Sequence, residues 1–308
     1  MGRRKTAAVL AFLLSFFSLT AVYAAEEEET VEQPRFVTFE KKVENAEALY
    51  GEYIPVLMYH DFTSEDVESG DGMVATKEEL EEHIRFFLAD GYQIISLEKL
   101  DTLLKGVEHD YSLKGKGLGF TRKYLCITMD DGYYSNYELA YPLLRKFQVP
   151  AAVFAVTDFV TEQYGLQKFT WEQAKTMDDS GWLKVYSHSA DHIPVESGQE
   201  EAFLACMQKS EAALAEYLEK ERVKAMAYPN GQYTVQSQRM LEEDGYVMQF
   251  TIEKGVITRD TKRNAIPRIT VESGMTGEEV VRKIELAAEK AFAAEREGNS
   301  NEKNDYCG

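Results

Sequence analysis

Apolar residues recur along the chain in two alternating kinds of run, which are short continuous runs typical of buried strands and longer runs with helical spacing. The short runs predict strands at residues 54–59, 92–95, 124–129, 151–156, 183–187, 225–228, 246–252 and 266–271. The longer runs predict helices at residues 77–90, 97–104, 137–147, 171–179, 200–222, 235–244 and 277–295. Strands that alternate with helices favour a mostly parallel sheet or barrel covered by helices, so we predict an α/β fold.

Signals at the ends of the predicted helices support this segmentation. Thr76 begins Thr-Lys-Glu-Glu and Thr170 begins Thr-Trp-Glu-Gln, and both patterns are typical of a capping box at a helix start. Glycines stand just past three predicted helix ends, where a left-handed backbone often terminates a helix; they are Gly91, Gly181 and Gly245. Residues 106–122 contain four glycines and predict a surface loop.

The first residues predict an export signal. Arg3, Arg4 and Lys5 precede an apolar run at 7–21, and small residues close it at Ala24. We therefore predict a signal peptide at 1–24, an acidic linker at 25–52, a single folded domain at 53–295 and a disordered tail at 296–308. The protein would be secreted or associated with the cell surface; an uncleaved signal would instead tether it to a membrane.

Charge excludes one class of partner. The chain carries a net charge of −19, which becomes −22 without residues 1–24 because they hold three basic and no acidic side chains. Such a chain repels nucleic acid and anionic lipid, so we expect neither as a partner. Its three cysteines, Cys126, Cys206 and Cys307, lack paired spacing, so we expect free thiols.

Two adjacent carboxylates, Asp130 and Asp131, come directly after the strand predicted at 124–129. In α/β folds, active sites are built at the carboxyl ends of the strands. An Asp-Gly pair at 131–132 also makes an ordinary tight turn, and for Asp131 alone we favour that interpretation. A turn does not require a second carboxylate at Asp130, so the two together indicate a functional site.

His188 and His192 follow the strand predicted at 183–187 and are two of only five histidines in the chain. Histidines four residues apart can face one centre on a helical turn, and imidazole together with carboxylate suits a zinc-like ion. The spacing alone is more often a polar turn. Together with Asp130 and Asp131 at another strand end, the histidines predict a metal site.

Two further strand ends carry polar residues that have more ordinary explanations. His60 follows the strand at 54–59, where a histidine can equally be a cap or a residue at the edge of the core. Pro-Asn-Gly at 229–231 includes Asn230 and by itself predicts a turn. Neither segment predicts chemistry alone.

The order of these motifs resembles the polysaccharide deacetylases of carbohydrate esterase family four. The similar segments are Thr-Met-Asp-Asp-Gly at 128–132, His-Ser-x-x-His at 188–192, Ala-Tyr-Pro-Asn-Gly at 227–231 and Ile-Pro-Arg-Ile at 266–269. The likeness covers about residues 53–275, and Leu-Met-Tyr-His at 57–60 is similar to the branch of extracellular poly-N-acetylglucosamine deacetylases. The resemblance implies a deformed (β/α) barrel.

The resemblance also assigns roles by position. The ligands of a divalent metal would be Asp131, His188 and His192. Asp130 would be the general base for the attacking water, and His60 would protonate the leaving amine. The backbone N–H of Asn230 would help to stabilise the oxyanion, and Arg268 would orient Asp130.

These roles suit amide hydrolysis, because a bound dication can lower the pKa of water to about 7 and polarise a carbonyl. We expect Zn²⁺, with Co²⁺ or Ni²⁺ as alternatives, and an N-acetylated polysaccharide such as peptidoglycan or poly-N-acetylglucosamine as the substrate. Aromatic residues near the motifs could face sugar rings, although a place in the core is the more frequent explanation; they are Tyr59, Trp182, Tyr186 and Tyr228.

Two other functions also fit the same residues. The same metal and base would serve an esterase that removes O-acetyl groups from xylan-like glycans. A glycan-binding surface protein without turnover is the third interpretation, because Ala227 and Asn230 depart from the residues of many relatives, an arginine and an aromatic residue.

Overall fold

The computed structural model describes residues 52–66, 72–109, 118–120, 122–162, 165–218 and 222–305. All of them belong to one compact unit, Glu40–Gly308. The predicted signal peptide, nearly all of the predicted acidic linker and Cys307 lie outside the described residues. None of the described helices is both long and apolar enough to cross a membrane.

Seven parallel strands form a closed ring. The hydrogen-bonded order is β1-β10-β9-β8-β7-β6-β5, and β1 closes the ring by pairing with β5; β4 (Tyr92–Ile94) extends the sheet beyond β5. The ring strands are β1 (Val56–Tyr59), β5 (Lys123–Asp131), β6 (Ala151–Ala155), β7 (Leu183–Ser187), β8 (Ala225–Ala227), β9 (Met248–Lys254) and β10 (Ile266–Thr270). This ring confirms the predicted α/β class and the deformed barrel.

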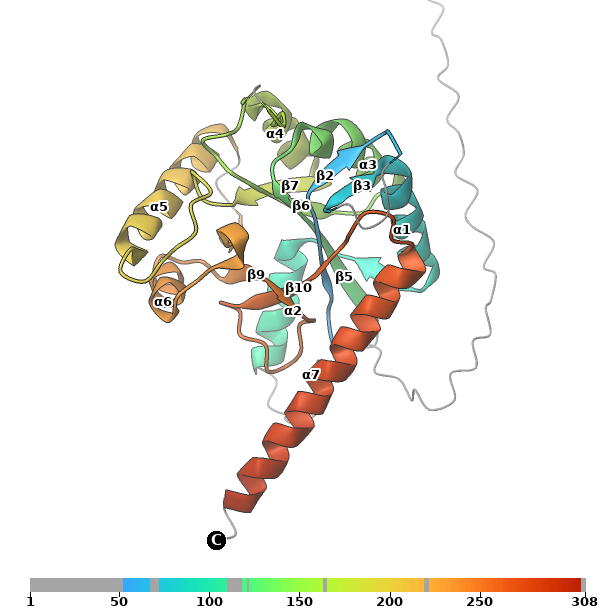
Figure 1. The fold of residues 1–308 in the computed structure, drawn as a ribbon, viewed down its shortest axis with the longest axis vertical. Coiled ribbons are helices and arrows are strands. Elements are labelled where there is room, and N and C mark those ends of the chain that lie inside the picture. The colour runs from blue at the N-terminus through green and yellow to red at the C-terminus, as the bar shows by residue number, and fades with distance from the viewer. Residues whose placement is uncertain are drawn as a thin grey trace, which may run out of the picture. The chain divides into compact units, whose positions relative to one another are not determined.

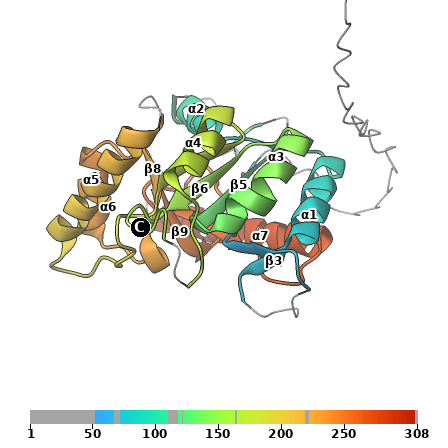
Figure 2. The same ribbon diagram turned by 90° about the horizontal axis from the view of Figure 1, so that it is seen from above.

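Helices surround the ring (Figure 1), and α4, α3 and α1 lie in a row along one side of the strands (Figure 2). The helices are α1 (Lys77–Ala89), α2 (Leu97–His109), α3 (Tyr141–Phe147), α4 (Trp171–Ser180), α5 (Glu200–Tyr217), α6 (Val235–Glu243) and α7 (Gly277–Asp305), with a π-helix η2 (Asn136–Ala140) before α3 and a 3₁₀ turn η3 (Pro229–Gly231). Both predicted capping boxes, at Thr76 and Thr170, are confirmed.

Three segments differ from the predictions. The short parallel pair of β2 (Asp61–Thr63) and β3 (Val74–Thr76) was not predicted, because three-residue runs carry too little periodicity. The helix α2 continues to His109 and so includes the start of the predicted 106–122 loop. The helix α7 continues to Asp305, beyond the domain end that we predicted at 295.

Side chains that alternate along the strands belong to different hydrophobic clusters. Phe154 of β6 lies at ring-centroid distances of 5.9 Å from Tyr186 and 5.3 Å from Phe250, in a cluster with Leu100 and Leu104 of α2. Alternate residues such as Val153 pack instead with the surrounding helices. Apolar side chains fill the barrel, and α2 packs with them. The candidate polar residues lie instead at the carboxyl ends of the strands.

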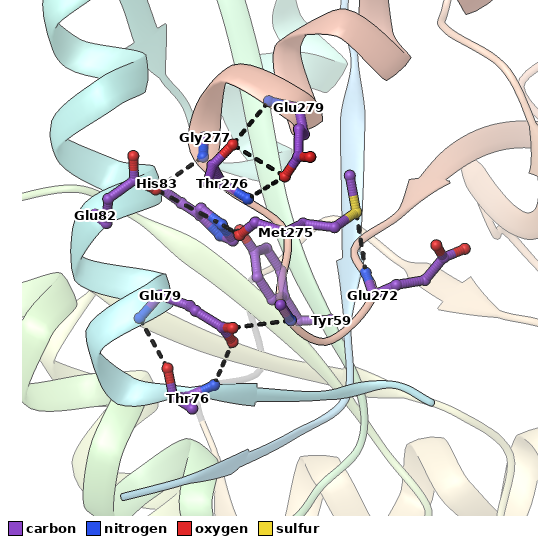
Figure 3. A network of polar contacts seen from close by, with 11 residues as sticks. Tyr59, Thr76, Glu79, Glu82, His83, Glu272, Met275, Thr276, Gly277 and Glu279 are labelled. Atoms are coloured by element: carbon purple, nitrogen blue, oxygen red, sulfur yellow. Dashed lines mark hydrogen bonds and ion pairs between the residues drawn. The ribbon is translucent and has the colours of Figure 1, made fainter. Parts of the chain in front are cut away.

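A buried polar contact fixes β1 against its neighbours (Figure 3). The hydroxyl of Tyr59 lies 2.9 Å from Nδ1 of His83, and Nε2 of His83 lies 2.6 Å from the carbonyl oxygen of Met275. The carbonyl can only accept, so Nε2 donates and Nδ1 accepts from Tyr59. This chain of bonds joins the end of β1 to α1 and to the segment before α7, and it thereby fixes the strand end that leads into His60.

Candidate metal centre and active site

Asp131, His188 and His192 converge at the carboxyl end of the ring. Oδ1 of Asp131 lies 3.5 Å from Nε2 of His188 and 3.3 Å from Nε2 of His192, and one candidate ligand atom from each residue lies within 4.8 Å of the others. Ligands about 2.1 Å from a tetrahedral ion lie roughly 3.4 Å from one another. The distances from Asp131 to the two histidines therefore match the spacing of ligands around a tetrahedral metal ion.

The backbone reaches this arrangement through unusual conformations. Asp131 has φ of 72°, Ser189 67° and His192 60°, although none is a glycine. Left-handed non-glycine residues store strain and are common at functional sites. The two histidines lie on an irregular loop, so the helical turn that we expected for their spacing is wrong; instead His192 N donates to Ser189 Oγ at 3.0 Å.

Hydrogen bonding sets the tautomer of His188. Its Nδ1 lies 2.8 Å from the carbonyl oxygen of Ala227, which can only accept, so Nδ1 carries the proton. Burial lowers the pKa of His188, against the opposing effects of Asp130 and Asp131, and favours the neutral ring. A lone pair on Nε2 then faces the Asp131 carboxylate, and a cation between the two acceptors would convert their repulsion into attraction. The donor set therefore fits a divalent metal.

Asp130 forms a buried ion pair with Arg268. Nη1 of Arg268 donates to Oδ1 and Nη2 to Oδ2 of Asp130, each at 2.7 Å, and the two residues are 2% and 0% exposed. Burial raises the pKa of Asp130, but the charge of Arg268, with smaller contributions from His188 and His60, holds it well below its usual range. The contact predicted between Arg268 and Asp130 is present, and Asp130 is ionised.

His60 lies beside Asp130 at the same edge. In the ring, Tyr59 pairs with Met129, so the next residues, His60 just after β1 and Asp130 within β5, lie at the same level on neighbouring segments. Nδ1 of His60 is buried and has no hydrogen-bond partner among the described residues. The position is compatible with the predicted role as acid, which stays a prediction.

Asn230 lies in the turn after β8 and has φ of 53°. Its side chain is exposed. The neighbouring strand β7 leads into the His188 loop, so the turn is on the carboxyl edge of the ring. The predicted use of the Asn230 N–H as an oxyanion donor stays a prediction.

Sequence reasoning missed the segment that follows Asp131. The hydroxyl of Tyr133 donates to Oδ2 of Asp131 at 2.9 Å, and Nδ2 of Asn136 donates to the carbonyl oxygen of His60 at 2.9 Å. Ser135 Oγ donates to Asp61 Oδ1 at 2.6 Å. The signal available was the run of polar and aromatic residues at 133–138, but such a run is equally typical of a loop.

The aromatic residues near the motifs belong to the core rather than to a sugar-binding surface. Tyr59, Tyr186 and Tyr228 are at most 2% exposed. Trp182 directly precedes β7, at the opposite end of the strand from His188, and packs against the core. These four side chains are therefore not placed to stack on a substrate at the metal site.

Comparisons with known proteins agree with this geometry. The family model described as polysaccharide deacetylase matches residues 118–249. A Bacillus subtilis relative, YxkH, whose name assigns it to the same family, is 29% identical over 227 residues, which are 73% of each chain. The poly-β-1,6-N-acetyl-D-glucosamine N-deacetylase of Staphylococcus epidermidis is 29% identical over 174 residues, which are 53% of this chain and 58% of that relative.

Solved structures share the fold. The Streptococcus pyogenes deacetylase PplD, solved with acetate, superposes with a TM-score of 0.63 at 21% identity, over 75% of this chain and 98% of that one. IcaB from Ammonifex degensii superposes with a TM-score of 0.59 at 23% identity, over 72% of this chain and 93% of that one. At such identities the likeness establishes the distorted barrel.

Proposed function

The chain belongs to the polysaccharide deacetylase family, and from that premise we propose that it hydrolyses N-acetyl groups on the aminosugars of an extracellular or cell-wall polysaccharide. It is an enzyme of the class that cleaves carbon–nitrogen bonds other than peptide bonds. The observation that carries the proposal is the convergence of Asp131, His188 and His192 beside the ionised Asp130.

The chain's own residues divide the work of hydrolysis. Asp131, His188 and His192 would hold a divalent ion, which when bound polarises the acetyl carbonyl and lowers the pKa of water to about 7. Asp130 takes the proton of the attacking water, and Arg268 keeps that carboxylate ionised and oriented until then. His60 gives a proton to the departing amine.

The proposed substrate is peptidoglycan or poly-N-acetylglucosamine. The name of the Staphylococcus epidermidis relative supports an acetylated glucosamine polymer. The arginines and lysine before the apolar run at 7–21 support export, which would place the enzyme outside the membrane with such polymers. Two imidazoles and one carboxylate support Zn²⁺ as the metal, with Co²⁺ or Ni²⁺ as alternatives.

Acetate release from the purified protein tests the proposal. We expect release from β-linked N-acetylglucosamine oligomers with Zn²⁺ or Co²⁺, loss of release after chelation, and recovery when the metal returns. Release from O-acetylated xylan but not from N-acetylated oligomers would identify an esterase. Glycan binding that survives chelation, without any acetate release, would identify a binding protein.

A further inference from the structure

The two oxygens of the Asp131 carboxylate have different partners. Oδ1 faces Nε2 of both His188 and His192, at 3.5 and 3.3 Å. Oδ2 accepts a hydrogen bond from the hydroxyl of Tyr133 at 2.9 Å. Oδ1 is therefore directed to the candidate metal centre, while Oδ2 is held by the uncharged hydroxyl of Tyr133.

Tyr133 is itself held by the segment that follows β6. Tyr133 forms an isolated antiparallel bridge with Lys168, and the backbone bonds around it run from Tyr134 N to Gln167 O at 2.8 Å and from Phe169 N to Gly132 O at 3.3 Å. The ammonium of Lys168 lies 3.5 Å from the centroid of the Tyr133 ring. A cation over the ring face, together with the bridge, restricts the phenol to one place.

We infer that Tyr133 is a positioning residue that restricts Asp131 to binding the metal through Oδ1 alone. The inference rests on the proposed function, because it concerns the same metal centre. A carboxylate without a second partner can turn and offer both oxygens to an ion, which fills a coordination position that water and substrate need. The hydrogen bond from Tyr133 keeps that position open.

The substitution Tyr133→Phe distinguishes a residue that positions Asp131 from one that only packs in the loop. Substitution of Tyr133 by phenylalanine retains the ring, its contact with Lys168 and the backbone bridge, and it removes only the hydroxyl. If Tyr133 only packed in the loop, this substitution would change the metal affinity of the protein little. If Tyr133 orients a metal ligand, the substitution lowers that affinity, since partners of metal ligands typically contribute about 10–100-fold to affinity or activity.

The matched control is the adjacent tyrosine. Tyr134 has a similar half-buried setting, its ring lies 6.3 Å from that of Tyr137, and its hydroxyl makes no hydrogen bond within the part of the chain that the structure describes. Tyr134→Phe therefore removes the same atom from the neighbouring position without touching Asp131.

The experiment titrates Co²⁺ into the metal-free full chain against a coloured chelator and records the visible absorption of the bound ion. We expect Tyr133→Phe to bind Co²⁺ about 10–100-fold more weakly and Tyr134→Phe to bind it as the wild type does. The bound Co²⁺ of Tyr133→Phe should also absorb more weakly, because a second carboxylate oxygen raises the coordination number above four.

Two results would overturn the inference while leaving the proposed function in place. One is wild-type Co²⁺ affinity in Tyr133→Phe, and the other is an equal loss in both tyrosine variants, which would indicate general damage to the loop. A wild-type protein that binds no Co²⁺ or Zn²⁺ would overturn the proposed function together with this inference.

Discussion

Arg268 donates two parallel hydrogen bonds to the carboxylate of Asp130, although the two residues are 138 positions apart in the chain. Arg268 also donates from Nε to the carbonyl oxygen of Thr251 at 2.8 Å and from Nη1 to Thr128 Oγ1 at 3.2 Å. A buried guanidinium and a buried carboxylate each lose much hydration, and only well-aligned bonds of this kind offset that loss. Each residue therefore depends on the other for its place in the core.

Arg268→Met is expected to lower the free energy of unfolding by about 3–5 kcal/mol, because it leaves the Asp130 charge buried without a partner. Urea unfolding of the wild type and the variant measures the loss. The double variant that also carries Asp130→Asn should recover part of it, since the uncompensated charge is then removed. A loss of under about 1 kcal/mol would match an exposed pair and contradict the buried one.

Asp130→Asn is expected to reduce acetate release by about 10²–10⁴-fold, because the amide is nearly isosteric with the carboxylate but cannot accept the proton of the attacking water. Co²⁺ affinity should remain close to that of the wild type, since Asp130 is not among the three clustered ligands. Initial rates and a parallel Co²⁺ titration measure the two quantities. Full turnover in this variant would remove Asp130 from the mechanism.

Local signals in the sequence predicted the individual elements well, because the physics that sets them is local. Thr76 and Thr170 begin helices through bonds to residues three positions further on, and β7 spans the residues predicted from its apolar run. Glycines at 91, 181 and 245 adopt the left-handed conformation expected after helix ends. These features need only a few neighbouring residues, so a short window of sequence contains them.

The closure of the ring and the details of the site depend on distant partners, and no short window contains those. β1 pairs with β5 about 70 residues away, and Arg268 meets Asp130 only because β10 and β5 both flank β1. The left-handed conformations of Asp131 and His192 are uncommon for residues other than glycine, and the fold around them selects them. Motif order suggested which residues meet, but not the bonds from Tyr133 and Asn136.

Asn136→Leu is expected to lower kcat by up to about 100-fold while leaving Co²⁺ affinity unchanged. Nδ2 of Asn136 holds the His60 carbonyl, and a shift of the predicted acid by about 1 Å can cost that much in rate. Oδ1 of Asn136 is buried without a hydrogen-bond partner among the described residues.

Steady-state kinetics and urea unfolding together test the role of Asn136. Asn136→Leu removes the bond to the His60 carbonyl but also removes a buried oxygen, Oδ1, that has no partner among the described residues. The two effects oppose each other, so we expect the free energy of unfolding to change by under about 1 kcal/mol while kcat changes greatly. The opposite pattern, with a large loss of stability and an unchanged kcat, would show that Asn136 supports the fold alone.

Stability should fall as the pH drops below about 6.5, the usual pKa of histidine in an unfolded chain, because His83 is buried as the neutral ring. Burial lowers the pKa of His83 in the folded protein, and the bond to Met275 and the charges of Glu82 and Glu79 oppose this only in part. The unfolded state then binds more protons than the folded state. The stabilising contribution of His83 is therefore fully present above pH 6.5 and is lost as the pH falls toward the lowered pKa of His83 in the folded protein.

Urea unfolding of the wild type and of His83→Gln between pH 7.5 and about 4.5 isolates this effect, because the contribution of His188 is common to both proteins and cancels in the difference. As the pH falls, the free energy of unfolding of the wild type should decrease more steeply than that of His83→Gln, by up to about 1.4 kcal/mol per pH unit for one proton. Parallel curves would mean that His83 takes up its proton in the folded protein, which requires the bond from Tyr59 to His83 to rearrange.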